Sequence, residues 1–253
     1  DTYVNRAKLL YQTGKYKDAN AFSSLALEIA IKQGNELLQA NFHFDIGVQS
    51  RLAKDMEKAI ENFEKALVLY KELRLNEKVA LVYNELGVIG FKLGETQGAL
   101  DYYSRAIAAC DTSKYILSIV NNNRSLIYSQ TQDTLKAIDM LQESIQLVDE
   151  EKELIARYNL LGEIFYHQNK LDTALKLFIS AVLLNDFSGD HGIRPDEMYT
   201  SLNYLEKVQK DVNDPYLLVD RGVQSKITEF TMWLLGNNIE LSSAVERLRY
   251  RRA

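Results

Sequence analysis

The stretch YNELGVIGFKLGETQGALDYYSRAIAA, residues 83–109, carries a pattern that recurs along most of the chain. Small and apolar residues from Tyr83 to Phe91 lie on helical spacing, and a second apolar stripe runs from Ala99 to Ile107. Gly94 lies between the two stripes and can take the positive φ that ends a helix. Residues 83–109 therefore predict two helices joined by a tight turn.

Small residues twelve positions apart recur in five copies, and we expect them to let the two helices of each copy approach closely. The pairs are Ala7 and Ala19, Gly47 and Ala59, Gly87 and Ala99, Ser125 and Ala137, and Gly162 and Ala174. Four positions after the second small residue stand Phe63, Tyr103, Leu141 and Phe178, while the first copy has Ser23, with Phe22 as a substitute. The turn position holds Gly14, Lys54, Gly94, Gln132 and Asn169. Repetition at a fixed register is typical of stacked repeats.

This pattern resembles the tetratricopeptide repeat, in which W-x2-L-G-x2-Y is followed by A-x3-F. Tyr83, Leu86, Gly87, Ala99 and Tyr103 match it. Further copies read Tyr158, Leu161, Gly162, Phe165, Ala174 and Phe178, and, more weakly, His43, Ile46, Gly47, Ala59 and Phe63. The starting tryptophan and the helix-ending proline are absent from every copy, and the copies are offset by 40, 40, 38 and 37 residues rather than roughly 34.

The resemblance is closest to the long-repeat variety found in kinesin light chains, cell-polarity adaptors and bacterial peptide-pheromone receptors. It implies an all-α fold, a right-handed superhelical solenoid of about five helix pairs. We expect repeats at residues 1–33, 34–73, 74–110, 111–149 and 150–184, a polar linker at 185–195, and a helical cap with an outgoing helix at 196–253. The apolar residues expected to cover the end of the solenoid are Met198, Leu202, Leu205, Leu217, Leu218 and Phe230.

Composition limits the classes of function. A net charge of −5 gives no general attraction to nucleic acid or to an anionic membrane. The one cysteine, Cys110, excludes an internal disulfide framework and fits a reducing, cytoplasmic compartment. No apolar run approaches the roughly 18 residues of a membrane span. No metal, phosphate-loop or nucleophile motif is present, so we expect neither a cofactor nor an enzyme.

One segment superficially resembles a calcium-binding loop. Residues 186–197 place acidic or hydroxyl side chains at loop positions 1, 3, 5 and 12, but His191 stands where a glycine is required. A plain polar linker is the interpretation that we favour.

The resemblance also implies that the first helix of each pair lines a concave groove. Three positions before the first small residue, the groove would present Asn84, Asn122 and Asn159 in successive repeats. An amide offers both a donor and an acceptor, so such a ladder can hold an extended peptide backbone. The alternative is that these amides bond helix backbones of the neighbouring repeat. If they bind peptide, replacing all three by alanine should remove binding and leave the thermal midpoint nearly unchanged.

Charged and aromatic side chains complete the predicted groove. Arg51 and Lys92 are expected to clamp an acidic group, or else to be solvated or paired with Glu85 or Glu163. Aromatic residues at helical spacing also serve as core, so each of the following has both interpretations. The candidates for apolar pockets are Tyr11, Phe44, Phe91 and Tyr166.

Three hypotheses follow for the function. The first is a non-catalytic scaffold that binds a protein or peptide segment in the concave groove, and self-association is compatible with it. The second is a sensory or regulatory module of a larger bacterial signalling protein, coupled to an output domain after Ala253, since the chain begins with Asp1 and ends on a basic helix. The third, binding of nucleic acid by residues 239–253, ranks last because of the net charge.

Overall fold

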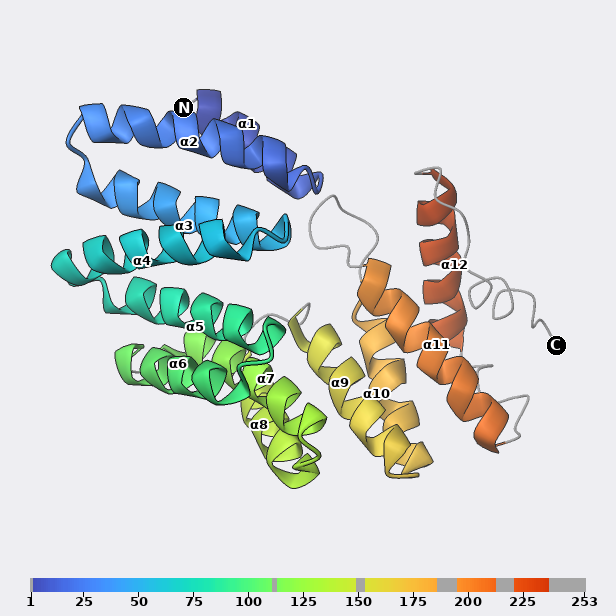
Figure 1. The fold of residues 1–253 in the computed structure, drawn as a ribbon. Coiled ribbons are helices and arrows are strands. Elements are labelled where there is room, and N and C mark those ends of the chain that lie inside the picture. The colour runs from blue at the N-terminus through green and yellow to red at the C-terminus, as the bar shows by residue number, and fades with distance from the viewer. Residues whose placement is uncertain (1, 111–112, 149–152, 186–194, 213–220, 237–253) are drawn as a thin grey trace. The chain divides into compact units, whose positions relative to one another are not determined.

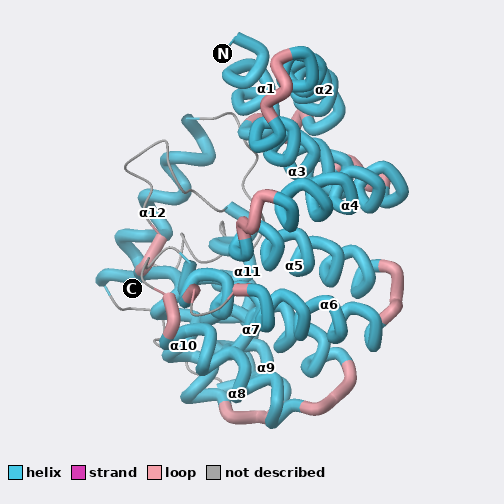
Figure 2. Tube along the Cα trace, turned by 90° about the vertical axis from the view of Figure 1, so that its left-hand side faces the viewer, coloured by secondary structure: helices cyan, strands magenta, loops and turns pink. Residues whose placement is uncertain are grey.

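The computed structural model describes residues 2–110, 113–148, 153–185, 195–212 and 221–236. These residues form twelve helices and contain no strand. The helices are α1 (Thr2–Gln12), α2 (Tyr16–Lys32), α3 (Glu36–Leu52), α4 (Met56–Glu72), α5 (Asn76–Lys92), α6 (Thr96–Ala109), α7 (Lys114–Gln130), α8 (Thr134–Gln146), α9 (Leu154–His167), α10 (Leu171–Leu183), α11 (Pro195–Val212) and α12 (Arg221–Gly236). Short turns join the two helices of each pair (Figure 2).

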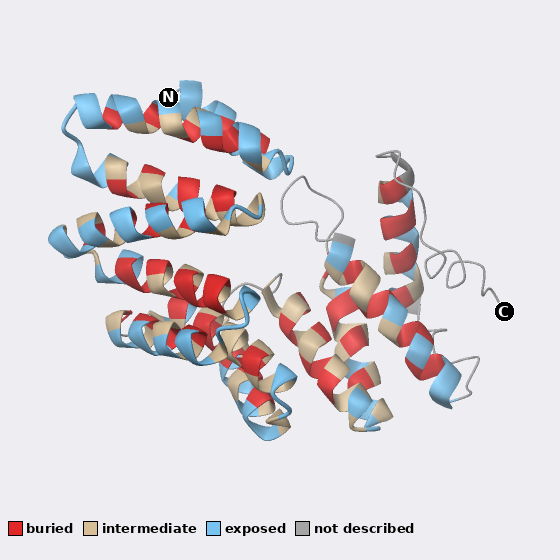
Figure 3. Cartoon of the chain, viewed as in Figure 1, coloured by how far each residue is buried: buried red, intermediate tan, exposed pale blue. Residues whose placement is uncertain are grey.

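The chain divides into two compact units, Asp1–Ile127 and Tyr128–Ala253, and each is described by itself. In the first unit, α1 packs on α2, α3 on α4, and α5 on α6, while α2 contacts α3 and α4 contacts α5 (Figure 1). Each pair therefore stacks on the next pair along the chain. Burial follows one face of each helix, and α5 is buried along most of its length (Figure 3).

The five predicted turn positions share one backbone conformation. Gly14, Lys54, Gly94, Gln132 and Asn169 all have positive φ, between 59° and 84°. The residue after each one donates its backbone N–H to the carbonyl five residues earlier, at 2.8–2.9 Å. This bond ends a helix in a left-handed residue. The prediction that this position stops the first helix is confirmed, even where a lysine or glutamine must adopt a conformation that favours glycine.

Close helix approach depends on a glycine that faces an aromatic ring. A Cβ atom added to Gly87 would lie 2.5 Å from Cε1 of Tyr103. A Cβ atom added to Gly47 would lie 2.7 Å from the ring of Phe63, and one added to Gly162 would lie 2.8 Å from the ring of Phe178. All three rings are at most 1% exposed. The first small residue of each of these three copies is therefore a glycine because the partner ring occupies the space of a side chain.

The second small residue has a different neighbour from the one that we expected. Ala99 is fully buried, but a Cβ on Gly90, not Gly87, would meet its backbone, at 3.5 Å. The two small residues of the third copy thus act at separate points. Gly87 accommodates the ring of Tyr103, and Ala99 admits the last turn of α5.

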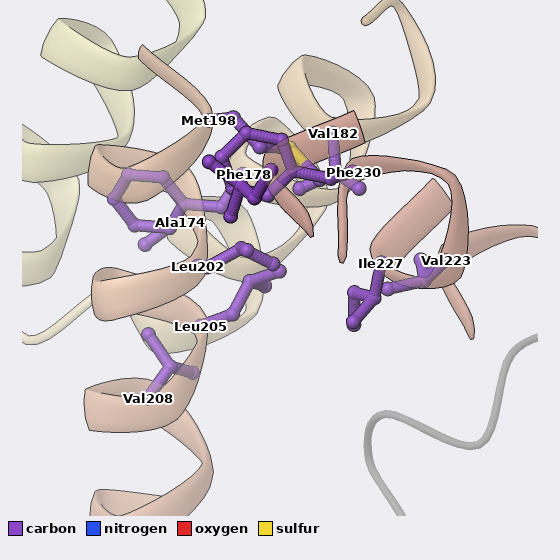
Figure 4. Packing of buried hydrophobic residues seen from close by; sticks show 11 residues of the cluster. Ala174, Phe178, Val182, Met198, Leu202, Leu205, Val208, Val223, Ile227 and Phe230 are labelled. Atoms are coloured by element: carbon purple, nitrogen blue, oxygen red, sulfur yellow. The ribbon is translucent and has the colours of Figure 1, made fainter. Parts of the chain in front are cut away.

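The second unit contains an apolar core formed by its last three helices. Phe178 and Val182 of α10 pack against Met198, Leu202 and Leu205 of α11 and Phe230 of α12 (Figure 4). These residues of α11 and α12 pack against the apolar face of α10. The described part of α11 runs to Val212, and that of α12 from Arg221 to Gly236. The predicted linker, apart from Asn185 and Pro195, lies outside the described residues, as do Leu217, Leu218, most of the calcium-like loop and the basic helix at 239–252.

The glycine contacts predict a specific cost for a single methyl group. Gly87→Ala should lower the free energy of unfolding by ~1–3 kcal/mol, because the buried ring of Tyr103 must shift. Gly98→Ala is the matched control, since its Cβ would meet nothing closer than 3.9 Å, and a gain of ~0.5–1 kcal/mol is expected in an exposed helix. Denaturant unfolding measures both. Equal effects of the two substitutions would contradict this packing.

Candidate peptide-binding surface

Two of the three predicted groove asparagines form hydrogen bonds within the chain. Asn84 is 3% exposed, and its Oδ1 accepts a hydrogen bond from Nδ2 of Asn123 on α7 at 2.8 Å. Asn159 is buried to the same extent. Its Nδ2 donates to the backbone oxygen and the carboxylate of Glu197, at 2.9 and 3.0 Å, and its Oδ1 accepts from Ser201 at 2.7 Å.

These hydrogen bonds are closer to the alternative interpretation, in which the amides bond to the neighbouring repeat, than to a ladder that holds a peptide. Asn84 and Asn159 each connect the first helix of one repeat to a helix 38 or 39 residues further along the chain. Their partners include side chains as well as the backbone carbonyl of Glu197. Asn122 is partly buried, and no described residue donates a hydrogen bond to its buried Oδ1. Peptide binding by the three asparagines stays a prediction.

The charged groove candidates form a small cluster on α3 and α5. Nε of Arg51 donates to Oε2 of Glu85 at 2.7 Å, and both side chains are mostly buried. This pairing is one of the alternatives predicted from the sequence. Lys92 remains exposed, and its pKa is lowered by partial burial and then by the charge of Arg51. A clamp for an acidic group made by Arg51 and Lys92 stays a prediction, with Glu85 as the group that such a ligand would have to displace.

The aromatic candidates differ in what they contact. Phe91 is partly buried against the core cluster that contains Tyr103. The hydroxyl of Tyr166 donates to Asp211 at 2.7 Å. Phe44 packs against Phe63, with ring centroids 5.6 Å apart, and its other side lines two cavities. Of the four aromatic candidates, Tyr11 and Phe44 therefore both border a cavity.

The two cavities lie in the first unit, beside α1 and α3, and have volumes of about 450 and 780 Å³. Both are bordered by Val4, Phe42, Phe44 and Asp45. In the resemblance, groove residues also stand one, four and five positions after the first small residue of each copy, and the smaller cavity is lined by several residues at these positions or three before it. These residues are Val4, Lys8, Tyr11, Gln12, Phe44 and Val48. First-helix residues of two successive repeats are thus brought together around one concave space.

Two polar residues of the smaller cavity were not predicted from the sequence. Asp45 and Gln49 line it from α3, and Gln49 donates from Nε2 to Oγ of Ser23 on α2 at 3.0 Å. A signal for Gln49 was present in the sequence. The position two after the first small residue is apolar in the other four copies, as Leu9, Ile89, Ile127 and Ile164. A polar residue at an otherwise apolar register position indicates that a polar side chain is required at this point of the structure.

None of the helices within the described ranges is both long and apolar enough to cross a membrane. Among the same residues, no group of three His, Cys, Asp or Glu side chains could hold a metal ion. Cys110 is buried, and its thiol donates to the carbonyl of Ile107 at 3.2 Å.

The fold and this surface define an all-α protein built from repeated helix pairs. The family model described as tetratricopeptide repeat matches residues 38–112. This match identifies tetratricopeptide repeats in residues 38–112, and helix pairs of the same kind continue outside them. A curated relative, the uncharacterized protein ycf37 of Pyropia yezoensis, is 30% identical over 109 residues, which are 42% of this chain and 59% of that protein. The chain therefore matches less than two thirds of that relative's length.

Solved structures show the same fold at low sequence identity. BtubC from P. vanneervenii superposes with a TM-score of 0.69 at 16% identity, over 94% of this chain and 96% of that one. PilW, described as a type IV pilus biogenesis factor, gives 0.61 at 16% identity, over 98% and 96% of the two chains. PilF of Pseudomonas aeruginosa gives 0.59 at 16% identity, over 100% and 97%. These likenesses place the fold among all-α superhelical repeat solenoids.

Because Asn84 is buried and hydrogen-bonded, its replacement should destabilise the fold, which the sequence alone did not suggest. Asn84→Ala should lower the free energy of unfolding by ~1–3 kcal/mol, because it removes the hydrogen bond to Asn123. The earlier expectation of an unchanged thermal midpoint is not compatible with this bond. Asn5→Ala, at an exposed position of α1, is the control and should be neutral or slightly stabilising. Thermal unfolding that cannot distinguish the two variants would show that the Asn84 bond contributes nothing.

Proposed function

We propose that the chain is a non-catalytic scaffold that binds an extended peptide or protein segment along the face of its first helices. The observation that carries the proposal is the cavity of about 450 Å³ beside α1 and α3. Its lining combines the groove positions of two repeats, so it presents apolar walls with polar groups beside them. Concave sites of this size that are mostly apolar and contain a few polar groups are typical ligand sites.

Electrostatic coupling supports a continuous face across α1, α3 and α5. Burial and Tyr16 raise the pKa of Tyr11 on α1, Arg51 of α3 lowers it, and Glu85 of α5 raises it. The pKa of Lys92 responds to Arg51 and Glu85 in turn. Groups that affect each other's ionisation in this way lie near one another. The face is therefore a candidate path for a peptide that passes the cavity and then the Arg51–Glu85 pair.

Selection from a random-peptide library displayed on phage tests the proposal without knowledge of the partner. The wild-type chain should enrich specific peptides. The double variant Tyr11→Glu with Lys92→Glu should lose them, because both side chains are exposed on the proposed face.

The control for this selection carries matched charge changes on second helices. Lys17→Glu on α2 and Val68→Glu on α4 alter exposed residues outside the cavity lining. This double variant should retain the peptides that the wild type enriches. Enrichment of no peptide by the wild type, or equal losses in both double variants, would contradict binding on the first-helix face.

A further inference from the structure

The cavity beside α1 and α3 exists where the first repeat departs from the register of the others. Ser23 stands at the position that holds Phe63, Tyr103 and Phe178 in three other copies. In those copies the ring fills the space beside a glycine. Here the small Ser23 and Ala7 both border open space instead. The cavity therefore adjoins the register position at which three other copies carry a core ring.

One residue that lines this cavity, Gln49, carries a buried acceptor that no described residue uses. Gln49 is 5% exposed and donates its Nε2–H to Ser23, but none of the described residues donates a hydrogen bond to its Oε1. A buried carbonyl oxygen without a partner is unfavourable unless a ligand or water supplies the missing donor. This oxygen is closed to solvent, but the residue lines the cavity, so a rotation of its terminal amide would present Oε1 to a donor group of a ligand placed there.

A second acceptor lies one helical turn away. Asp45 precedes Gln49 by four residues on α3, so the two side chains share a face of the helix. Asp45 stays exposed to solvent at the cavity, and no described cation lies within ion-pair distance of it. Loss of surrounding water nevertheless raises its pKa to about 6, although Lys78 lowers it. A ligand cation would stabilise the ionised carboxylate.

Other titratable groups face Asp45 from each neighbouring element. Lys8 and Tyr11 of α1 line the same cavity, while Tyr70 of α4 and Lys78 of α5 line the larger one. Burial and then the charge of Asp45 raise the pKa of Tyr70, so this hydroxyl stays neutral. The two lysines are exposed and do not form an ion pair with Asp45 among the described residues.

We propose that this cavity selects an arginine side chain of the bound peptide, with its guanidinium group between Gln49 Oε1 and Asp45. The inference rests on the proposed peptide-binding function and specifies its side-chain preference. A guanidinium group has five donors in a rigid plane, so it can serve a neutral and a charged acceptor at the same time. Its methylene chain would lie along the apolar surface of Val4, Phe44 and Val48. Tyr11 supplies an aromatic face on which guanidinium groups stack favourably.

Citrulline tests the charge requirement because it keeps the shape of arginine and removes its charge. Peptides enriched by the wild type should contain arginine at one position, and its replacement by citrulline should weaken binding by about tenfold. In Asp45→Asn the same replacement should change affinity less than about twofold. Glu36→Gln, an equal charge change at an exposed position of α3 outside both cavities, is the control and should retain the tenfold difference.

Gln49→Ile tests the neutral acceptor and is expected to fold, because it restores the residue found in three other repeats. This variant should bind the arginine peptide more weakly than the wild type does. Its affinity for the citrulline peptide should be no higher than that of the wild type. Isothermal titration measures each affinity. Between pH 7.5 and pH 5 the arginine peptide should lose affinity, since protonation of Asp45 removes the charge that its guanidinium contacts. The Asp45→Asn variant should lose this pH dependence.

The outcomes separate the inference from the proposed function. Peptides that bind the first-helix face but show the same effect of citrulline in the wild type and in Asp45→Asn would overturn the arginine site and leave the scaffold intact. Enriched peptides without a basic residue, or with lysine preferred over arginine, would do the same. Failure of the wild type to enrich any peptide would overturn both.

Discussion

The structure depends on the contact between a helix glycine and an aromatic ring sixteen residues later. Gly47 and Phe63, Gly87 and Tyr103, and Gly162 and Phe178 pack so closely that a single added methyl group would overlap the ring. The other two copies omit both partners together, since Ala7 is followed by Ser23 and Ser125 by Leu141. A ring is thus found where the opposite position lacks a side chain. This matching of sizes brings two helices into a close pair, and the turn with positive φ sets the point at which the chain reverses.

The same constraint explains where the candidate site lies. In the first repeat, Ser23 stands where three other copies carry an aromatic ring. In the second repeat, Gln49 stands where three other copies carry an isoleucine. The result is a cavity with apolar walls, an acceptor that no described residue satisfies and the carboxylate of Asp45 nearby. A repeat that gives up part of its core packing loses stability locally. Such a departure from an otherwise regular pattern is often associated with a functional site.

The periodic features of this fold could be predicted from the sequence, because spacing, turn position and small residues are local properties. The turns at Lys54 and Gln132 were predicted from register alone, although neither residue type favours the positive φ found there. The roles of individual polar groups could not be predicted in this way. Whether Asn84 faces a ligand or bonds to Asn123 depends on the rotation of α5 and on a residue 39 positions away. The Arg51–Glu85 pair and the cavity at Gln49 likewise arise from helices that are distant in sequence.

A double-mutant cycle on Gly47 and Phe63 tests the size matching most directly. Gly47→Ser and Phe63→Leu together recreate the combination of Ser125 and Leu141 found in the fourth repeat. Each single substitution should destabilise the chain, and the double variant should be more stable than the sum of the two losses predicts, by ~1 kcal/mol or more. Losses that add within ~0.5 kcal/mol would mean that the glycine and the ring do not constrain each other, and the packing described for all the repeats would be contradicted.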